Sequence, residues 1–456
     1  MNAKTFYAMA ERTRSHVPST AMMLLAMAPY VVAITIAYLF YSEILPHFRP
    51  YAWVDDWIYS KPIEFETFRE WWSWLWQQHV DHRIPIQKLF SFLVLSFSGF
   101  DYRWLVAINF AMALATSLLL IEVAKRYRGT RSIGDIAIPL IILNFGMGYT
   151  QWGFHFQFMS SVLFMSSFLL STLIWLQSQK TAPALFAVLS LILASLTGMN
   201  GVLPTLGVGL AFTVWAIWRR KSVGVVFLFA VPLGMASVIL ATWTRYNVGD
   251  FPPINIGEFL GYTVGLSTAS FTFYLQNYET VARAFMGTLV LLAAASFIFR
   301  ALRKDVDDTD LLLLAFLGVY LCLIASISYG RVKVQGGWEY GSAVHYGVLT
   351  IFIPVISWMI LSRSVPKLIS EVLGVAVLVF AVLVFQANYQ WRTWMIGYDE
   401  PLQSKTLQDL RSNKSIDQIA ADNIKQFHVG MGGMKEVTDG ISVLRKAGFE
   451  LYGGKP

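Results

Sequence analysis

Long apolar stretches separated by short polar segments run along most of the chain. About eleven of them approach the roughly 20 residues that a helix needs to cross the hydrocarbon core of a membrane. This pattern predicts an all-α polytopic membrane protein. The predicted spans are residues 20–42, 104–124, 133–150, 156–176, 182–199, 202–218, 223–243, 281–300, 310–328, 344–361 and 367–386.

The composition agrees with the apolar pattern. Hydrophobic residues make up 56% of the chain and charged residues 14%, and the mean hydropathy is +0.53, values typical of an integral membrane protein and not of a soluble domain. The net charge of +7 comes largely from basic clusters at the ends of apolar stretches, among them Lys125 to Arg131 and Arg219 to Lys221. These clusters fall in alternate loops between the spans, and basic loops tend to be cytoplasmic. The pattern therefore predicts a cytoplasmic N-terminus. The first apolar stretch is too long for a signal peptide and is expected to be a retained span.

The sequence predicts a transmembrane domain, a large outer loop within it and a C-terminal tail. Residues 1–386 form the transmembrane domain, and residues 43–103 within it form a first outer loop. In this loop FETFREWWSWLWQQ has the aromatic periodicity of an interfacial helix, and the apolar run from Ile84 to Phe97 is too short to span. Pro85 suits the first turn of that second helix. Residues 387–456 are expected to form a small outer helical tail.

Candidate chemistry begins with two adjacent aspartates, Asp55 and Asp56, in the loop segment YAWVDDWIY. Two neighbouring carboxylates repel each other, so their pKa values differ. One can then serve as a general base while the other orients a partner or binds a metal. The alternative is a solvated pair that caps the following helix. The aromatic residues around the pair favour a functional role over free solvation.

A second polar cluster, HVDHR, lies in the same loop and contains His79, Asp81, His82 and Arg83, with Lys88 on the helix that follows. The histidines and Asp81 could ligate a divalent metal together with Asp55 or Asp56, although the spacing is not a specific zinc pattern. The planar guanidinium of Arg83 suits a phosphate. The alternative for Arg83 and Lys88 is contact with lipid headgroups.

Two further segments carry polar side chains near expected membrane boundaries. Arg331, Lys333 and His345 belong to a late outer loop, where cations favour an anionic partner such as a lipid phosphate over ordinary headgroup contact. A second set of aromatic and polar residues could line a groove for a sugar or a lipid. The alternative is that these residues form an aromatic belt at the membrane interface. The residues of this groove are Trp53, Trp57, Gln151, His155 and Gln157.

The order of these features resembles the C-type membrane glycosyltransferase superfamily (GT-C), including bacterial lipid-linked sugar transferases of the GtrII-like kind. The resemblance rests on short segments of this sequence: VDDW, QHVDHRIPIQKLF, WGFHFQF, MNGVLP and GRVKVQGGWEYGSAVHY. It extends over nearly the whole chain. One departure is that several members have a Ser-Arg-Tyr sequence where this chain reads Ala343-Val344-His345-Tyr346, so the basic role there would pass to His345 or Arg331.

The resemblance implies a GT-C-like fold and an inverting transferase in the bacterial inner membrane. Its donor would be a sugar linked to polyprenyl phosphate, such as undecaprenyl phosphate, and its acceptor a cell-envelope glycan, a lipopolysaccharide or another lipid-linked glycan. Asp55, or failing it Asp56, would be the base at the periplasmic face. Arg83, Lys88, Arg331 or His345 would stabilise the departing phosphate. The partners would be the bilayer, the donor and the acceptor, and not a nucleic acid.

Two other functions compete with this interpretation. A transporter or flippase of lipid-linked sugars is expected to have inverted repeats and charges in the middle of its spans, and the sequence has few such charges. A membrane acyltransferase would depend on a histidine near the membrane, for which His155 or His345 are the candidates.

Overall fold

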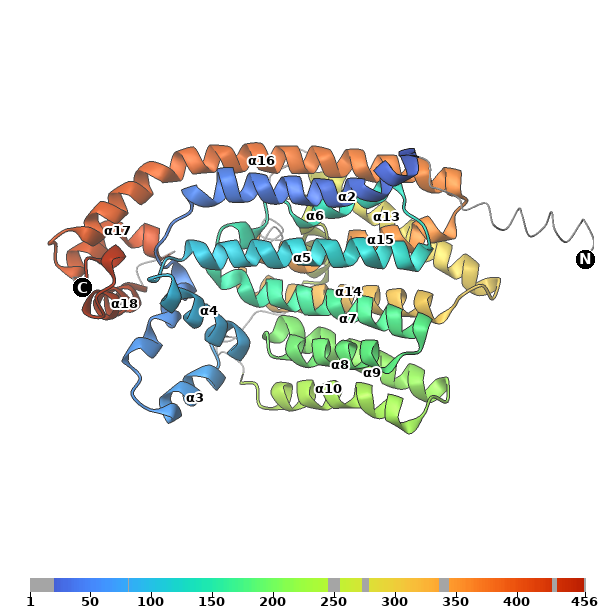
Figure 1. Cartoon of the computed structure of the whole chain (residues 1–456), viewed down its shortest axis with the longest axis horizontal. Helices are drawn as coiled ribbons and strands as arrows, with labels where there is room; N and C mark the ends of the chain where they lie inside the picture. Colours follow the sequence, from blue (N-terminus) through green and yellow to red (C-terminus); the bar gives the residue numbers. More distant parts are fainter. Residues whose placement is uncertain are drawn as a thin grey trace, which may run out of the picture.

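The computed structural model describes residues 20–80, 82–244, 255–272, 279–335, 344–428 and 433–454. They form an elongated bundle of helices, with α3, α4, α17 and α18 gathered at one end, here called the tail end (Figure 1). The α-helices are α2 (Thr20–Leu39), α3 (Phe68–Trp76), α4 (Pro85–Phe97), α5 (Arg103–Arg128), α6 (Ala137–Ile142), α7 (Phe156–Ser178), α8 (Thr181–Ser195), α9 (Met199–Trp218), α10 (Val223–Ala241), α11 (Ile256–Ser267), α12 (Ala269–Thr272), α13 (Glu279–Leu302), α14 (Asp308–Gln335), α15 (Phe352–Ser364), α16 (Lys367–Arg411), α17 (Ile416–Phe427) and α18 (Met434–Lys446).

Short segments of π-helix and 3-10 helix connect several of these helices. A π-helical turn, Phe40–Ile44, continues α2. The 3-10 turns are Leu45–His47, Val54–Tyr59, Lys61–Glu64, Ile133–Ile136, Gly148–Thr150, Gly153–His155, Val344–Thr350 and Glu450–Tyr452.

Within the described residues, nine helical segments are long and apolar enough to cross a membrane. These segments are Met23–His47, Arg103–Arg128, Gly153–Ser178, Met199–Trp218, Val223–Ala241, Thr280–Leu302, Asp308–Val332, Tyr346–Ser364 and Lys367–Arg411. The chain is therefore an integral membrane protein, as the sequence predicted. Two of the expected spans, 133–150 and 182–199, correspond to shorter apolar helical segments, Ile133–Ile142 and Thr181–Ser195.

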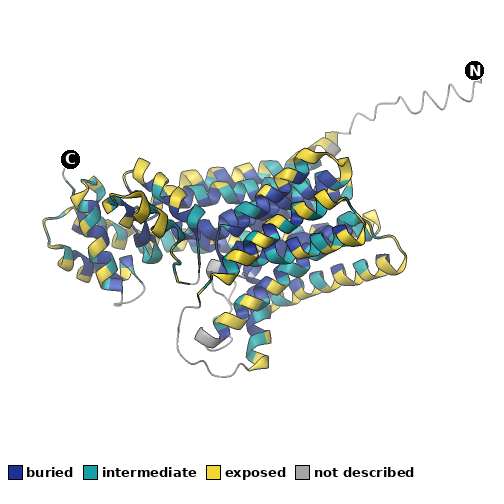
Figure 2. Ribbon diagram, turned by 90° about the horizontal axis from the view of Figure 1, so that it is seen from below, coloured by how far each residue is buried: buried dark blue, intermediate teal, exposed yellow. Residues whose placement is uncertain are grey.

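Apolar side chains cover much of the outer surface of the bundle. Figure 2 shows exposed residues along the outward faces of the long helices. On α10, Val223, Phe227, Val231 and Val238 are exposed. Such extensive apolar exposure is unfavourable in water and favourable against lipid tails.

The expected span 133–150 is not a continuous helix, because α6 ends at Ile142. Beyond it, the Asn144 side chain accepts a hydrogen bond from the Gly146 N–H at 3.0 Å and stabilises a turn. The Phe145 carbonyl accepts two hydrogen bonds, at 3.1 and 2.8 Å, from the buried guanidinium of Arg392 in α16. Arg392 thus satisfies a main-chain group that a continuous helix would have paired internally.

The helix α16 continues without interruption from Lys367 to Arg411. At 1.5 Å per residue its 45 residues extend about 68 Å, roughly twice the thickness of a hydrocarbon core. The sequence placed the end of the last span near residue 386 and a separate tail after it. In the structure the same helix carries the chain from the apolar bundle into the tail.

The tail and the first loop share one hydrophobic core at the tail end. Trp57 from the loop packs edge-on against Phe427 of α17, with ring centroids 5.7 Å apart. Its indole N–H donates to the Phe427 carbonyl at 3.3 Å. Gly440 in α18 lies directly over the Trp57 ring, where a Cβ would be only 2.3 Å from a ring carbon. The tail therefore fixes the loop that carries the acidic pair.

At the opposite end of the bundle, charged residues from three helices and a tyrosine from a fourth contact one another. The buried carboxylate of Asp310 accepts hydrogen bonds from Arg300 at 2.7 Å, Arg363 at 3.1 Å and the Tyr127 hydroxyl at 2.6 Å. Arg300 and Arg363 stand at the ends of apolar stretches, as the basic clusters in the sequence do. They are paired and hydrogen-bonded, as buried charges require.

Candidate functional site

The candidate site is centred on a contact between Asp55 and His79. Asp55 lies in the 3-10 turn Val54–Tyr59, and its Oδ1 is 3.0 Å from Nε2 of His79. Both side chains are partly exposed, His79 by 19% and Asp55 by 29%. The sequence placed these two residues in separate clusters, and the fold of the first loop brings them together. A carboxylate held by an imidazole and still open to solvent can accept a proton.

The backbone beside both residues is strained. Val54 has a φ of +53° and Val80 a φ of +48°, in the left-handed region that β-branched residues rarely adopt. Each of these valines directly adjoins one member of the Asp55 and His79 pair. Strain of this kind costs about 1–3 kcal/mol per residue and is concentrated at functional sites.

Asp56 has a different environment from its neighbour. Its side chain is buried near the start of the turn Gly153–His155, and a Cβ on Gly153 would lie 3.3 Å from Oδ1 of Asp56. Burial raises the pKa of Asp56 well above its usual value, and the Asp55 carboxylate raises it further. Hydrogen bonds from the main chain of Trp53 and Phe154 oppose this rise. Asp56 therefore favours the neutral form.

Aromatic rings surround the pair. Trp152 donates its indole N–H to the Trp53 carbonyl at 3.1 Å, and the two rings meet edge to face at 5.1 Å. Phe154 stacks on Trp152 at 5.4 Å and lies 5.3 Å from the His79 ring. Trp53 and the segment around residue 151, which the sequence assigned to one groove, thus meet at the acidic pair. Aromatic faces of this kind suit contact with sugar rings or lipid.

The HVDHR cluster forms a tight turn. The main chains of His79 and His82 exchange two hydrogen bonds of 2.8 Å. Burial lowers the pKa of His82 to about 4, and the positive charge of Arg331 contributes to this shift. His82 is therefore neutral near pH 7. Asp81, which sits between these residues in the sequence, lies outside the described residues.

Arg83 and Gln78 attach this turn to the end of α10. Arg83 donates to the Thr242 hydroxyl at 2.5 Å and to the Thr242 carbonyl. Gln78 donates to the Thr244 carbonyl at 2.5 Å and accepts from the Thr244 N–H at 3.1 Å. These contacts position the turn, so Arg83 is engaged with protein as well as being close to the candidate site.

Lys88 has a structural environment that the sequence did not reveal. Its buried ammonium group donates to the carbonyls of Trp74 at 2.6 Å and Gln77 at 2.7 Å, at the C-terminal end of α3. It also lies 5.4 Å from the Trp74 ring centroid. Burial lowers its pKa to about 8, with a smaller effect from Lys61. Lys88 thus caps α3, and these contacts occupy the group that was expected to face a phosphate.

On the far side of His82, Arg331 at the end of α14 donates through Nε to the Tyr346 hydroxyl at 2.7 Å. The Tyr346 ring packs edge-on against Phe158 at 5.8 Å, and Phe158 also contacts the ring of His82 at 6.4 Å. Arg331 is therefore linked to the HVDHR turn through aromatic contacts. The side chains of Lys333 and His345 lie outside the described residues.

The proposed groove residues divide into two groups. His155 and Gln157 are buried at the start of α7, and the His155 ring contacts Trp152 at 5.1 Å. Trp57, by contrast, is only 1% exposed beneath the tail. It packs in the core and is not available to line a groove. This burial could not be predicted from the sequence, because Gly440 lies far from Trp57 along the chain.

Sequence reasoning missed other residues that support the site. Gln87 in α4 donates to the Tyr59 hydroxyl and, at 3.0 Å, to the Phe154 carbonyl. Tyr102 donates to the Asp56 carbonyl at 3.2 Å. These contacts hold the acidic turn against α4 and α5. Only the buried polar character of Gln87 on an apolar helix could have signalled such a role.

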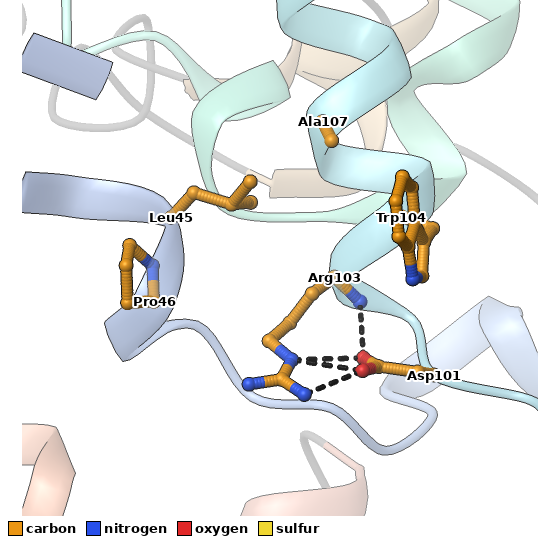
Figure 3. Close-up of a pocket in the computed structure, with 6 residues that line it drawn as sticks. All are labelled: Leu45, Pro46, Asp101, Arg103, Trp104 and Ala107. Carbon is orange, nitrogen blue, oxygen red and sulfur yellow. Dashed lines mark hydrogen bonds and ion pairs between the residues drawn. The ribbon is translucent and has the colours of Figure 1, made fainter. Parts of the chain in front are cut away.

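A separate recess opens where the chain leaves α2 and enters α5. It has a volume of about 320 Å³ and is lined by Leu45, Pro46, Asp101, Arg103, Trp104 and Ala107 (Figure 3). Arg103 folds back onto Asp101, with Nη2 2.5 Å from Oδ2. The two charges neutralise each other, and the other lining residues are apolar. This recess lacks the reactive groups of the Asp55 site.

No group of three or more His, Cys, Asp or Glu side chains in the described part of the chain is arranged to hold a metal ion. The sequence suggested Asp55, Asp56, His79, Asp81 and His82 as possible metal ligands. Of these five residues, Asp81 lies outside the described residues. No model of a known protein family matches the sequence. No curated protein matches it significantly.

Proposed function

We propose that this protein is an inverting glycosyltransferase that moves a sugar from a polyprenyl-phosphate donor to an acceptor, with Asp55 as the general base. The observation that supports this most is the contact between Asp55 and His79 in a ring of aromatic side chains. A partly exposed carboxylate beside stacking surfaces suits the deprotonation of a sugar hydroxyl.

In the proposed reaction, Asp55 takes the proton from an acceptor O–H group. The acceptor oxygen attacks the anomeric carbon and forms the new C–O bond. The bond between that carbon and the phosphate oxygen breaks at the same time, and its electron pair leaves with the polyprenyl phosphate. Attack opposite to the leaving group inverts the anomeric carbon. Atoms and charge balance without a nucleotide or a redox partner.

The environments of the two aspartates support different roles. His79 holds Asp55 by one oxygen, which leaves the other available to an acceptor. Asp56 is buried against the start of the turn Gly153–His155 and favours the neutral form. Asp56 would therefore shape the loop, and Asp55 would carry the proton. The sequence left this choice open.

Cations near the site would stabilise the leaving phosphate. Arg331 is close enough to lower the pKa of His82, and Arg83 belongs to the same turn as His79. Both bring positive charge to the region where negative charge grows as the bond breaks. Lys88 is not part of this proposal, because two carbonyls hold its ammonium group.

The proposed setting is the bacterial inner membrane, with the tail end in the periplasm. The basic residues at the opposite end of the bundle agree with a cytoplasmic location for that end. A donor carried by a lipid would then enter from the bilayer beside the apolar faces of the helices. The acceptor would be a glycan of the cell envelope.

The test is a donor screen with the purified protein in detergent. Polyprenyl phosphates carrying different hexoses and pentoses are incubated with envelope glycans, and the products are analysed by mass spectrometry and by NMR of the new linkage. Transfer with inversion is the expected result. A flippase would give no product in detergent, where there is no second compartment, and transfer with retention would contradict the role of Asp55 as a base.

A further inference from the structure

The start of α9 is in close contact with the start of α4 and with polar side chains. Gly198, which precedes α9, has a φ of +98°, a conformation that favours glycine. A Cβ at this position would lie 3.1 Å from Cγ2 of Ile84, 3.2 Å from Oε1 of Gln157 and 3.4 Å from Nδ1 of His82. Ile84 is the residue that precedes α4. Two helix N-termini therefore meet at one point beside the HVDHR turn.

Neither of these helices neutralises its own N-terminus. The helices α4 and α9 have 13 and 20 residues, and neither has an acidic residue in its first turn or a side chain that caps it. Helix N-termini carry partial positive charge and unpaired N–H groups, which attract anions. By comparison, α3 begins with a complete capping box formed by Thr67 and Glu70. The starts of α4 and α9 have no cap of this kind.

Three polar side chains, two of them next to Gly198 and the third in the first turn of α9, have buried atoms without a hydrogen-bond partner. These atoms are Nδ1 of His82, Oε1 of Gln157 and Nδ2 of Asn200. Gln157 is 1% exposed and Asn200, the second residue of α9, is 2% exposed. Leaving such a buried group unpaired costs about 1–3 kcal/mol. Because the amide of Gln157 can rotate, it can offer a donor as well as an acceptor.

We propose that the N-termini of α4 and α9, with His82, Gln157 and Asn200, form a binding site for a phosphate group. Unpaired polar side chains and two uncapped helices supply hydrogen bonds and positive potential at one place. Gly198 lets the backbone approach the phosphate closely. If the protein is the proposed glycosyltransferase, this phosphate is that of the lipid carrier, and this identification rests on the proposed function.

The position of the site agrees with that identification. His82 is paired through its main chain with His79, and the side chain of His79 contacts Asp55. A phosphate at the start of α9 would therefore lie close to the base, separated from it by one histidine. Arg331 adds a full positive charge on the side of Tyr346 and Phe158.

The test is isothermal titration of the purified protein in detergent with farnesyl phosphate, and with farnesol as the ligand without phosphate. We expect Gln157→Leu and Gly198→Ala to weaken farnesyl phosphate binding at least tenfold. Leu removes a hydrogen-bonding side chain, and the Cβ of Ala would occupy the space beside Gln157 and His82. The matched control is Gln177→Leu near the other end of α7, where the side chain contacts the Arg126 carbonyl. Folding is checked by thermal melting, and Gln157→Leu decides the outcome if Gly198→Ala is unstable.

Unchanged binding in a folded Gln157→Leu protein, or equally tight binding of farnesol, would overturn the proposal. Displacement of farnesyl phosphate by inorganic phosphate would show that a free phosphate is recognised, and binding of the lipid form alone would show that the source is a lipid phosphate. Loss of binding in the variants without sugar transfer by the wild type would refute only the proposed function. Sugar transfer with unchanged binding would refute only this site.

Discussion

Asp55 and Asp56 are adjacent in the chain, yet 29% of the Asp55 side chain is exposed while Asp56 is 2% exposed. The 3-10 turn sends one carboxylate toward His79 and the other toward the turn Gly153–His155. A single turn thus separates a solvent-accessible acid from a buried one. This difference gives each residue its own test.

Asp56→Asn should retain activity and raise thermal stability at pH 8. We expect transfer within about threefold of wild type, because the amide oxygen can still accept a hydrogen bond from the Phe154 N–H. The folded-state pKa of Asp56 is raised, so its favourable contribution is present at low pH and is lost as pH rises through that pKa. The stability gain of the variant should therefore grow with pH above the usual value of 3.8. Melting curves from pH 4 to 8 measure it, and a large loss of transfer would contradict the assignment.

The sequence predicted those features of the structure that depend on residues close together in the chain. The helix that starts at Pro85 and the aromatic helix Phe68–Trp76 are confirmed, because apolar periodicity and a first-turn proline act within one helix. The break after Ile142 was missed, since it depends on Arg392, which lies far along the chain. Periodicity cannot report such a partner.

The candidate site shows the same division. The sequence indicated Asp55 and His79 as candidate site residues but not their contact, because the fold of the first loop sets it. The burial of Asp56 depends on the segment that contains Gly153, and that of Trp57 depends on Gly440. Residue type therefore indicated the chemistry, and tertiary packing decided which groups remain accessible.

His79 is expected to act as a positioning residue for Asp55. His79→Ala removes the 3.0 Å contact and should lower kcat about 10- to 100-fold with a smaller change in donor KM. His79→Gln, which can still donate a hydrogen bond, should recover part of this loss. Steady-state kinetics of the three proteins measure the effect. Equal rates for Ala and wild type would show that the contact does not orient the base.

His82 should make the protein sensitive to acid. Its folded-state pKa is about 4 against a usual value of 6.5, so the unfolded chain binds more protons between these values and stability falls as pH falls through that window. The slope is at most about 1.4 kcal/mol per pH unit. Melting temperatures of wild type and His82→Gln at pH 7.5, 5.5 and 4.5 test this, because Asp56 titrates in both proteins. An identical acid response in both would rule out His82 as its source.

Lys88→Met should destabilise the protein by about 1–3 kcal/mol, because the carbonyls of Trp74 and Gln77 lose their buried donor. Transfer per folded molecule should stay near wild type. Lys61→Met, at an exposed lysine of the same loop, is the control and should have little effect on melting. Loss of activity without loss of stability would return Lys88 to the group of phosphate ligands.

The rate of sugar transfer by Asp55→Asn, measured with the donor found in the screen, tests the central claim most directly. Asp101→Asn, in the same loop and paired with Arg103, is the matched control. With Asp55 as the base, the rate should fall about 100-fold or more while the melting temperature stays close to that of wild type. Asp101→Asn should transfer sugar at close to the wild-type rate. A folded Asp55→Asn protein that turns over at the wild-type rate would contradict the account.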